Sequence, residues 1–430
     1  QPRNSRYDFV GDRGMCPRDQ PFYLHSYRTN ERVSMKITDL KCAIIGQNPV
    51  VRITTDEGIA GIGQAEPAKQ DMKWLFLFYK DMIVGMDPTD VERVMQKIRR
   101  LGSFKPWGAG VSSIEMALWD IAGKAAGVPV YKLLGGKVRD RVMTYNGNVR
   151  RSMSDSQPED YAEEMRWMKS RPERFSIIKQ GIAFHGSMVR EVPGYFYGDL
   201  EKTKYHPNKG LITERGMKHT IACIEAMKDV LGDEIGLALD CGPGFGPTDA
   251  LKLAKSVEHL NVMWLEDMIT GDYTPYVLAD LYREITPYTT TPIHTGEQIY
   301  LRQNFMDLLE KRAVNIIGPD LADVGGLAEL KWIAEYADLH GISIAPHGTL
   351  DGLIGLAAQV QVAATLPTNY IAFEYPTGDP DWWYDIVEGL PTPIVKDSFI
   401  DVWDTPGLGV SLNVEATRKY LRPEDAGFFD

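Results

Sequence analysis

Residues 236–240 read Gly-Leu-Ala-Leu-Asp, residues 262–266 read Val-Met-Trp-Leu-Glu, and residues 292–297 read Pro-Ile-His-Thr-Gly-Glu. Each run is short and mostly apolar and ends in an acid, and about one helix of sequence separates it from the next. Two further runs end at Asp320 and at His347. Repeated strand-then-helix units of this size close into a barrel whose strand carboxyl ends meet on one face. We therefore expect five ionisable side chains, distant in sequence, to point into one pocket.

Three of these side chains are carboxylates on consecutive strands: Asp240, Glu266 and Glu297. A single acid after a strand more often caps the next helix or faces water, so the prediction rests on the recurrence. Three clustered carboxylates cannot all stay ionised without a cation among them, and an all-oxygen set suits Mg²⁺. Asp267 follows Glu266 directly, and strand alternation predicts that it points to the other face and has a capping or supporting role.

His347 and Asp320 end neighbouring strands of the predicted barrel. A carboxylate one strand away orients an imidazole and stabilises its charged form, which gives an acid–base group poised near neutrality. Glu374, in Ile-Ala-Phe-Glu-Tyr on the last strand, is a candidate to hydrogen-bond or protonate a substrate oxygen. The alternative for Glu374 is a salt bridge that closes the barrel.

Lys179 lies in Phe-Ser-Ile-Ile-Lys on the second strand and shares a face with Phe175 and Ile177. A lysine with apolar neighbours is costly to bury unless it meets negative charge, which a substrate carboxylate would supply. Desolvation would also lower its pKa. His294 is an odd number of residues before Glu297, so we expect it to face the other way and to be structural.

The rhythm of strand and helix begins after residue 136. We expect strands near 141–147, 174–180, 235–240, 261–266, 292–297, 313–318, 342–346 and 370–375. No glycine-rich phosphate loop follows the first strand, which favours a TIM-type barrel over a doubly wound sheet. The segment 181–213, which contains His185, His206 and several aromatic residues, is too long for an ordinary connection. Such insertions at a catalytic face are often lids or substrate walls.

The N-terminal third of the chain has a different pattern. We expect an extended arm over 1–35, antiparallel β structure over 36–65 and helices over 67–133. The best-defined helix begins with a capping-box pattern, Ser112-x-x-Glu115, and its periodic apolar face predicts a packing role. Gly127, followed by a proline, ends it.

The bulk composition describes an ordinary globular protein. Its 430 residues are 43% hydrophobic and 25% charged, which allows a large barrel and an additional module. A net charge of −12 and a pI near 5.3 argue against nucleic acid or an anionic membrane as a partner. No apolar run is long enough to span a membrane.

The cysteines and the chain start bear on location. The four cysteines lack CxxC spacing, which predicts reduced thiols and a cytoplasmic location. They are Cys16, Cys42, Cys223 and Cys241. The first residues carry neither an initiator methionine nor an apolar signal core, so missing residues and a removed leader both stay open.

Taken together, these residues resemble a known family. Asp240, Glu266 and Glu297 resemble the metal ligands of the enolase superfamily, and Asp320 with His347 resembles its mandelate racemase branch. The supporting strings are Met-Ala-Leu-Trp-Asp-Ile-Ala-Gly-Lys-Ala-Ala-Gly at 116–127, Leu-Leu-Gly-Gly at 133–136, Pro-Asp-Leu-Ala-Asp-Val-Gly-Gly at 319–326 and Pro-Gly-Leu-Gly-Val at 406–410. The resemblance covers nearly all of the chain after residue 35.

The resemblance implies an α/β fold, a modified (β/α)7β barrel under an α+β capping domain formed from both chain ends. The implied boundaries are 1–135 for the capping domain including the arm, 136–384 for the barrel and 385–430 for the segment that returns to the cap. It also implies Mg²⁺-assisted removal of the proton α to a carboxylate, which gives an enediolate. We further expect a homo-oligomer.

Two departures from the family pattern matter. The racemases carry a Lys-x-Lys pair on the second barrel strand, whereas here Lys179 stands alone, with Ile177 or Gly181 in the place of the other lysine. Gly242 stands two residues after Asp240, where some sugar-acid dehydratases of this branch carry a catalytic histidine. The absence of that base favours His347 as the acid–base group.

The resemblance favours a dehydratase that acts on a sugar acid, takes the proton on C2 and eliminates the 3-hydroxyl to give a 2-keto-3-deoxy acid. A racemase or epimerase with Lys179 and His347 on opposite faces of the substrate carbon is the alternative, followed by a cycloisomerase. A non-catalytic metal-stabilised scaffold is disfavoured, because a buried His–Asp pair and lysine would cost stability without a catalytic return. Whether Lys179 is a base or a charge partner stays open, and we favour the second.

Overall fold

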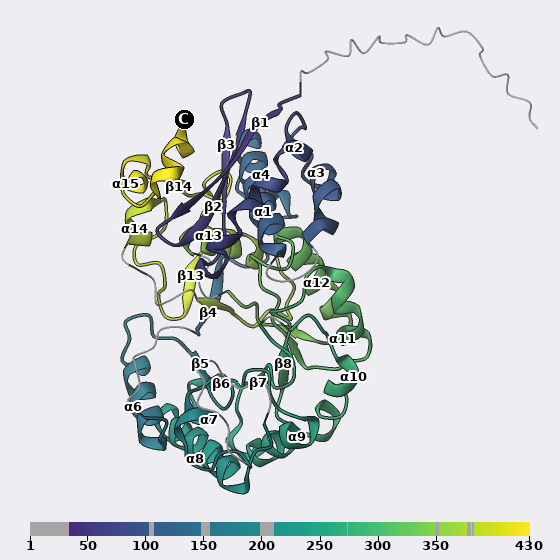
Figure 1. Cartoon of the computed structure of the whole chain (residues 1–430), viewed down its shortest axis with the longest axis vertical. Helices are drawn as coiled ribbons and strands as arrows, with labels where there is room; N and C mark the ends of the chain where they lie inside the picture. The colour runs from purple at the N-terminus through teal and green to yellow at the C-terminus, as the bar shows by residue number, and fades with distance from the viewer. Residues whose placement is uncertain are drawn as a thin grey trace, which may run out of the picture. The chain divides into compact units, whose positions relative to one another are not determined.

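The structure is a computed structural model (Figure 1). It describes residues 34–102, 107–147, 155–197, 210–272, 274–348, 352–375, 380 and 382–430. Residues 35–430 form one unit. The arm predicted over 1–35 therefore lies outside the described residues, except for its last two positions, and so does Cys16.

An antiparallel sheet of three strands opens the described chain, as predicted for 36–65. The strands are β1 (Ile37–Ile45), β2 (Asn48–Thr55) and β3 (Ala60–Gln64), in the order β1-β2-β3. The helices that follow are η1 (Pro67–Met72), α1 (Lys73–Phe78), α2 (Lys80–Ile83), α3 (Val91–Ile98), α4 (Gly108–Ala126) and α5 (Val130–Leu133). Helix α4 packs closely on β3. Glycine at positions 61 and 63 permits this approach, because a side chain there would collide with the carbonyl oxygen of Ala117 or Ser113.

The predicted start of the helix at Ser112 is wrong. Helix α4 begins one turn earlier, at Gly108, and the Ser112 hydroxyl donates to the Gly108 carbonyl at 3.0 Å from inside the helix. Glu115 is fully buried and turns toward a different helix, described below. The predicted end is confirmed, because Gly127 takes the left-handed conformation that terminates helices.

Eight parallel strands form the barrel, one in each region predicted to contain a strand. They are β4 (Arg141–Asn146), β5 (Ile177–Gly181), β6 (Gly236–Asp240), β7 (Trp264–Glu266), β8 (Ile293–Thr295), β9 (Ile316–Ile317), β10 (Ser343–Ile344) and β11 (Phe373–Tyr375). They lie side by side in chain order from β4 to β10, and β11 pairs with β4. Ile344 completes the closure, because its amide donates to Asn369 and its carbonyl accepts from Ile371 at 2.9 Å.

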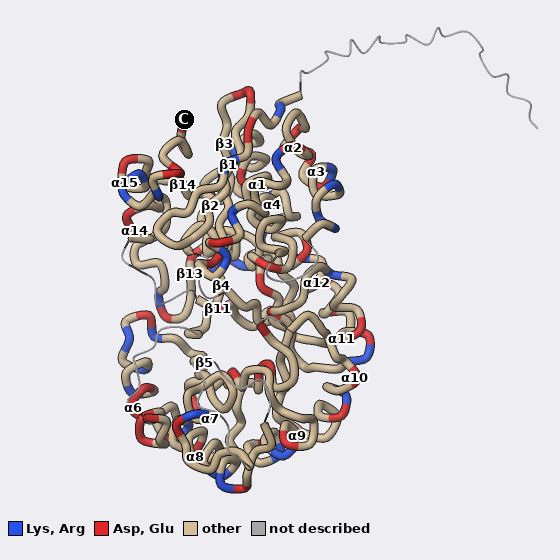
Figure 2. Tube along the Cα trace, viewed as in Figure 1, with Lys and Arg blue, Asp and Glu red and all other residues tan. Residues whose placement is uncertain are grey.

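Helices surround this sheet on the outside (Figure 1). They are α6 (Pro158–Lys169), α7 (Met188–Glu191), α8 (Glu214–Leu231), α9 (Pro247–Ser256), α10 (Ala279–Tyr282), α11 (Met306–Glu310), α12 (Leu327–Leu339) and α13 (Gly352–Ala363). The α/β fold class, a modified TIM barrel of the (β/α)7β type, is confirmed. The outer helix α6 carries both acidic and basic residues (Figure 2).

Side chains fill the inside of the barrel below the strand carboxyl ends. Trp264 is fully buried, stacks on His294 with ring centroids 5.3 Å apart and meets Tyr145 edge-on at 5.4 Å. Ile177 and Ile316 belong to the same cluster. This packed cluster excludes water from the barrel interior beneath the residues at the strand carboxyl ends.

The C-terminal segment contacts both the barrel and the first sheet. Its elements are α14 (Trp382–Ile386), β12 (Val387–Glu388), β13 (Phe399–Asp401), β14 (Ser411–Leu412), α15 (Val414–Arg418) and η6 (Pro423–Phe429). Strand β13 pairs antiparallel with β4, while Lys41 on β1 donates to the carbonyls of Gly427 at 2.8 Å and Asp430 at 2.7 Å. These contacts accord with the expected return of the chain to its first module, and the boundaries at 135 and 384 stay predictions.

Two further expectations concern thiols and membranes. Cys42, Cys223 and Cys241 are buried free thiols. Within the described ranges, every helix is too short or too polar to cross a lipid bilayer.

Candidate active site

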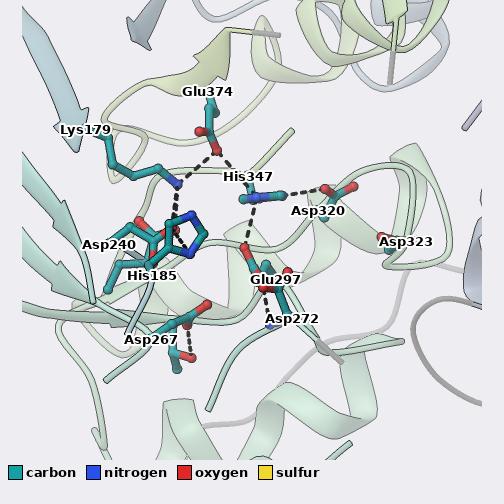
Figure 3. Close-up of polar contacts among 12 residues, drawn as sticks. Lys179, His185, Asp240, Asp267, Asp272, Glu297, Asp320, Asp323, His347 and Glu374 are labelled. Atoms are coloured by element: carbon teal, nitrogen blue, oxygen red, sulfur yellow. Dashed lines mark hydrogen bonds and ion pairs between the residues drawn. The ribbon is translucent and has the colours of Figure 1, made fainter. Parts of the chain in front are cut away.

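The barrel brings the three predicted acids to one end. Asp240 and Glu266 are the last residues of β6 and β7 and are directly paired across the ladder. Glu297 follows β8 by two residues. All three are buried, and Figure 3 shows Asp240 and Glu297 near Lys179 and His347. The predicted convergence of these strand ends is therefore observed.

Glu266 lies at the centre of the charged network. Its Oε1 accepts from Lys179 Nζ at 2.7 Å, and its Oε2 accepts from Trp264 Nε1 at 2.8 Å. His294 Nδ1 is 3.5 Å from the same Oε2. Burial raises the pKa of Glu266, but Lys179 and His294 outweigh burial and lower this pKa to about 2. Glu266 is thus held as an anion.

Lys179 enters this network from β5 and is 1% exposed. Its Nζ lies 3.1 Å from Glu374 Oε2 and 4.0 Å from Asp240 Oδ2, besides its contact with Glu266. Burial lowers the pKa of Lys179, but Glu266 and Glu374 outweigh burial and hold the pKa well above its usual range. Lys179 is buried against negative charge as predicted, but Glu266 and Glu374 supply that charge in this structure, and the pKa of Lys179 is raised rather than lowered as predicted.

His347 and Asp320 form the predicted pair. His347 Nδ1 lies 2.6 Å from Asp320 Oδ2, and the other Asp320 oxygen accepts from the Ala322 amide at 2.7 Å. On the far side of the ring, His347 Nε2 lies 2.9 Å from Glu297 Oε2 and 3.6 Å from Glu374 Oε2. Burial lowers the pKa of His347, but these carboxylates outweigh burial and raise it well above 6.5. Glu374 lies between Lys179 and His347 (Figure 3).

Strand alternation predicted that Asp267 points away from the site, and this prediction is wrong. Strand β7 ends at Glu266, and Asp267 has a φ of +52°, so alternation no longer applies. Its buried carboxylate accepts from the Thr295 hydroxyl at 2.6 Å. One oxygen each from Glu266, Asp267 and Glu297 lie within 4.8 Å of one another. Burial and then Glu297 raise the pKa of Asp267 well above its usual range.

His294 also faces inward, contrary to expectation. It lies on β8 over Trp264, and its Nε2 is 3.3 Å from the Ala345 carbonyl. We expected His294 and Glu297 to face opposite ways because they are three residues apart. That rule does not apply here, because β8 ends at Thr295 and Gly296 has a φ of +140°, so the side chains of His294 and Glu297 both turn inward. Its expected structural role, holding Glu266 and the barrel floor, accords with these contacts.

These residues fit a divalent cation. Four buried acids (Asp240, Glu266, Asp267 and Glu297) gather with oxygen donors only, which is the donor set that Mg²⁺ prefers. The compact group of three contains two of the predicted ligands and Asp267. Asp240 adjoins it through Lys179 and through its ladder pairing with Glu266.

Residues that precede the barrel in the sequence hold the loop that carries Asp320, which no sequence pattern predicted. Glu115 on α4 accepts from the amides of Leu327 at 2.6 Å and Ala328 at 3.0 Å, so it caps the N-terminus of α12. Lys69 on η1 is 1% exposed and lies 2.9 Å from Asp323. Both contacts fix the stretch just after Asp320.

His185 is a further site residue that the sequence placed only within the long insertion. It lies in the loop after β5, with its Nδ1 3.3 Å from Asp240 Oδ2 (Figure 3). The lid or substrate wall predicted for 181–213 falls partly outside the described residues, at 198–209, which include His206. On its described flanks, the Tyr197 amide donates to the Leu211 carbonyl at 3.0 Å.

Comparisons with known proteins agree with this geometry. The family described as mandelate racemase / muconate lactonizing enzyme, N-terminal domain, matches residues 31–135, and the one described as enolase C-terminal domain-like matches 198–417. This chain belongs to the mandelate racemase branch of the enolase superfamily. Within that superfamily, it is 33% identical to a D-xylonate dehydratase from Haloferax volcanii, over 91% of each chain.

Two further known proteins are similar to this chain over comparable lengths. A D-mannonate dehydratase from Caulobacter sp. (strain K31) is 28% identical, over 90% of this chain and 95% of its own. The crystal structure of a mandelate racemase/muconate lactonizing enzyme-like protein from Rubrobacter xylanophilus superposes with a TM-score of 0.77 at 29% identity, over 91% of this chain and 98% of the other. The enolase-superfamily fold thus extends over nearly the whole chain.

Proposed function

We propose that this chain is a Mg²⁺-dependent hydro-lyase that converts a sugar acid into a 2-keto-3-deoxy acid. The observation that carries the proposal is the His347–Asp320 pair at the edge of the carboxylate cluster, with Lys179 also buried in the site. Such a pair is the acid–base group that removal of a carbon-bound proton requires. The named dehydratase activities of the two relatives above support dehydration of a sugar acid as the reaction.

We assign the cation to Asp240, Glu266 and Glu297, with Asp267 as a supporting carboxylate. When bound, a divalent cation acts as a Lewis acid and stabilises negative charge that develops on a substrate carboxylate. The mutual repulsion of the buried acids supports the assignment, because the two cationic side chains, Lys179 and His347, are also shared with Glu374 and Asp320 and leave the acids of the cluster incompletely neutralised.

The chain's own groups move the protons. His347, oriented by Asp320, takes the proton from C2, and the electron pair of that C–H bond moves into the substrate carboxylate group to give the enediolate. The enediolate then collapses, and its electron pair forms the C2–C3 double bond as the bond to the 3-hydroxyl breaks. The imidazolium then gives its proton to the departing hydroxyl, so the products are water and an enol that tautomerises to the 2-keto acid. Lys179 stays protonated and neutralises the developing enediolate, and Glu374 hydrogen-bonds a substrate oxygen.

A racemase or epimerase is the second candidate. Lys179 and His347 approach the same Glu374 oxygen, at 3.1 Å and 3.6 Å, from different strands. Two proton-carrying groups that flank one position also suit proton transfer across the two faces of a carbon. The reaction products separate the two candidates.

Incubation of the purified chain with MgCl₂ and a panel of pentonic and hexonic acids, including D-xylonate and D-mannonate, tests the proposal. We expect at least one acid to give a 2-keto product that reacts with semicarbazide. Epimerised substrate without a keto product would establish the racemase instead. No change in any acid, from protein that is folded by circular dichroism, would contradict both candidates.

A further inference from the structure

We propose that His185 contacts the substrate directly and hydrogen-bonds one of its hydroxyl groups. This inference rests on the proposed function, because it names a residue that would recognise the sugar acid. His185 lies in a loop and is not one of the site residues that were predicted from the barrel strands.

The first observation is the exposure of the imidazole. The side chain of His185 is 33% exposed, whereas that of Asp240 beside it is 8% exposed and that of His347 is 11% exposed. His185 thus stands at the open side of a site whose other charged groups are buried.

The second observation is that the backbone of His185 is held in place. The His185 amide donates to the carbonyls of Ile182 at 2.9 Å and Cys241 at 3.1 Å, which fixes its backbone to the end of β6. Its neighbour Phe184 packs against Phe196 and Phe245, with ring centroids 5.5 Å and 5.1 Å apart. A side chain on such a rigid support binds a ligand with little entropic cost.

The third observation is that Gly242 lets the backbone of His185 approach the chain just after Asp240. A Cβ at Gly242 would lie 2.7 Å from the His185 amide nitrogen and 3.0 Å from its Cβ, and Gly242 also has a φ of +63°. A side chain two residues after Asp240 is therefore excluded, and the backbone of His185 occupies that space. In this chain the imidazole beside Asp240 comes from the loop after β5.

The alternative is that His185 serves only to orient Asp240 through its Nδ1. Two substitutions separate these roles because an imidazole has two nitrogens on different sides of the ring. His185→Asn keeps a polar atom near the Nδ1 position, next to Asp240, and removes the outer edge of the ring. His185→Gln places a polar atom near the Nε2 position instead.

The experiment uses the sugar acid that the wild type converts fastest. We measure KM and kcat for each variant, and we measure Mn²⁺ affinity by calorimetry without substrate. We expect His185→Asn to raise KM about 10- to 100-fold with Mn²⁺ affinity unchanged, since a lost hydrogen bond to a bound hydroxyl costs that order of affinity. We expect His185→Gln to keep KM within a few-fold of wild type. His259→Asn, a change at a 63% exposed histidine that follows α9 in the sequence and lies 3.9 Å from Glu225, is the matched control.

An unchanged KM in His185→Asn would overturn the inference. A rise in KM together with a loss of Mn²⁺ affinity would also overturn it, because that result would show that His185 serves only to orient Asp240. If His185→Asn does not fold, His185→Ala is read by the same criteria. A wild type that converts no sugar acid would overturn the proposed function and this inference together. An active wild type with an unaffected variant would overturn only the role of His185.

Discussion

The imidazole of His347 and the carboxylate of Asp320 are joined by a 2.6 Å contact between Nδ1 and Oδ2. The opposite ring nitrogen lies 2.9 Å from Glu297, one of the proposed metal ligands. One histidine therefore links the residue that orients it to the acids that would hold the cation. A cation held by Glu297 would compete with His347 for this carboxylate and would leave the imidazole available to a substrate.

Replacing His347 by asparagine is expected to abolish turnover. His347→Asn keeps a similar volume but removes the titrating group, and loss of a general acid–base typically costs about 10²- to 10⁴-fold in rate. Steady-state rates with MgCl₂ measure the effect, and circular dichroism with Mn²⁺ titration checks that fold and metal site survive. Near-normal turnover in this variant would rule out His347 as the acid–base group.

The pH dependence of stability in EDTA reports the charge on His347. Its folded pKa is raised above the unfolded value of 6.5, because the carboxylates around it outweigh burial. The stabilisation is therefore fully present below pH 6.5 and is lost as pH rises through the raised folded pKa. We expect the Tm difference between wild type and His347→Asn to shrink with rising pH. A constant difference would show that His347 is neutral in the ion-free protein.

Asparagine at Asp240 or at Asp267 tests which acids bind the cation. Asp240→Asn removes a proposed ligand, whereas Asp267→Asn changes a carboxylate that the Thr295 hydroxyl already contacts. Changes to such supporting groups cost about 10- to 100-fold in metal affinity, and we expect Asp240→Asn to cost more. Mn²⁺ titration of both variants provides the comparison. A greater loss at Asp267 would exchange the two roles.

Lys179→Met distinguishes a charge partner from a base. Because Glu266 and Glu374 hold the pKa of Lys179 high, we expect this lysine to remain protonated. The carboxylates around His347 also raise its pKa in the ion-free protein, but a cation held by Glu297 would offset that effect, and we expect His347 to remove the C2 proton. Exchange of the C2 proton in D₂O should then persist at a reduced rate in Lys179→Met and cease in His347→Asn. The reverse pattern would make Lys179 the base.

Glu115→Ala is expected to destabilise the protein and to lower kcat. The change leaves two buried amides at the start of α12 without their acceptor, which costs about 2–4 kcal/mol. It also loosens the stretch that follows Asp320. The control is Glu159→Ala, because the Glu159–Arg166 pair is exposed and such pairs contribute about 0–1 kcal/mol. Equal melting temperatures for the two variants would refute the capping role of Glu115.

The strand ends were predictable because each apolar run stops at a polar residue. Asp240, Glu266 and Glu297 each follow such a run, and the topology of a parallel barrel places them together without further information. The rule of alternation holds only within paired strand residues. It failed for Asp267 and His294, because β7 and β8 are three residues long and the backbone leaves the extended region next to each.

Long-range partners were beyond the reach of sequence reasoning. Ser112-x-x-Glu115 carries the pattern of a local capping box, but the Glu115 carboxylate caps a helix that begins 212 residues later. His185 sits in a loop without periodicity, and its proximity to Asp240 depends on the folded path of that loop and on Gly242. Both contacts follow from tertiary packing, which a local pattern does not encode.

The most direct test of the central claim is the reaction run in D₂O with MgCl₂ and followed by proton NMR. The account predicts a 2-keto-3-deoxy acid that carries one deuterium at C3, because the enol formed by loss of the C2 proton and the 3-hydroxyl takes its new C3 hydrogen from solvent. Substrate that gains deuterium at C2 without any keto product would contradict dehydration.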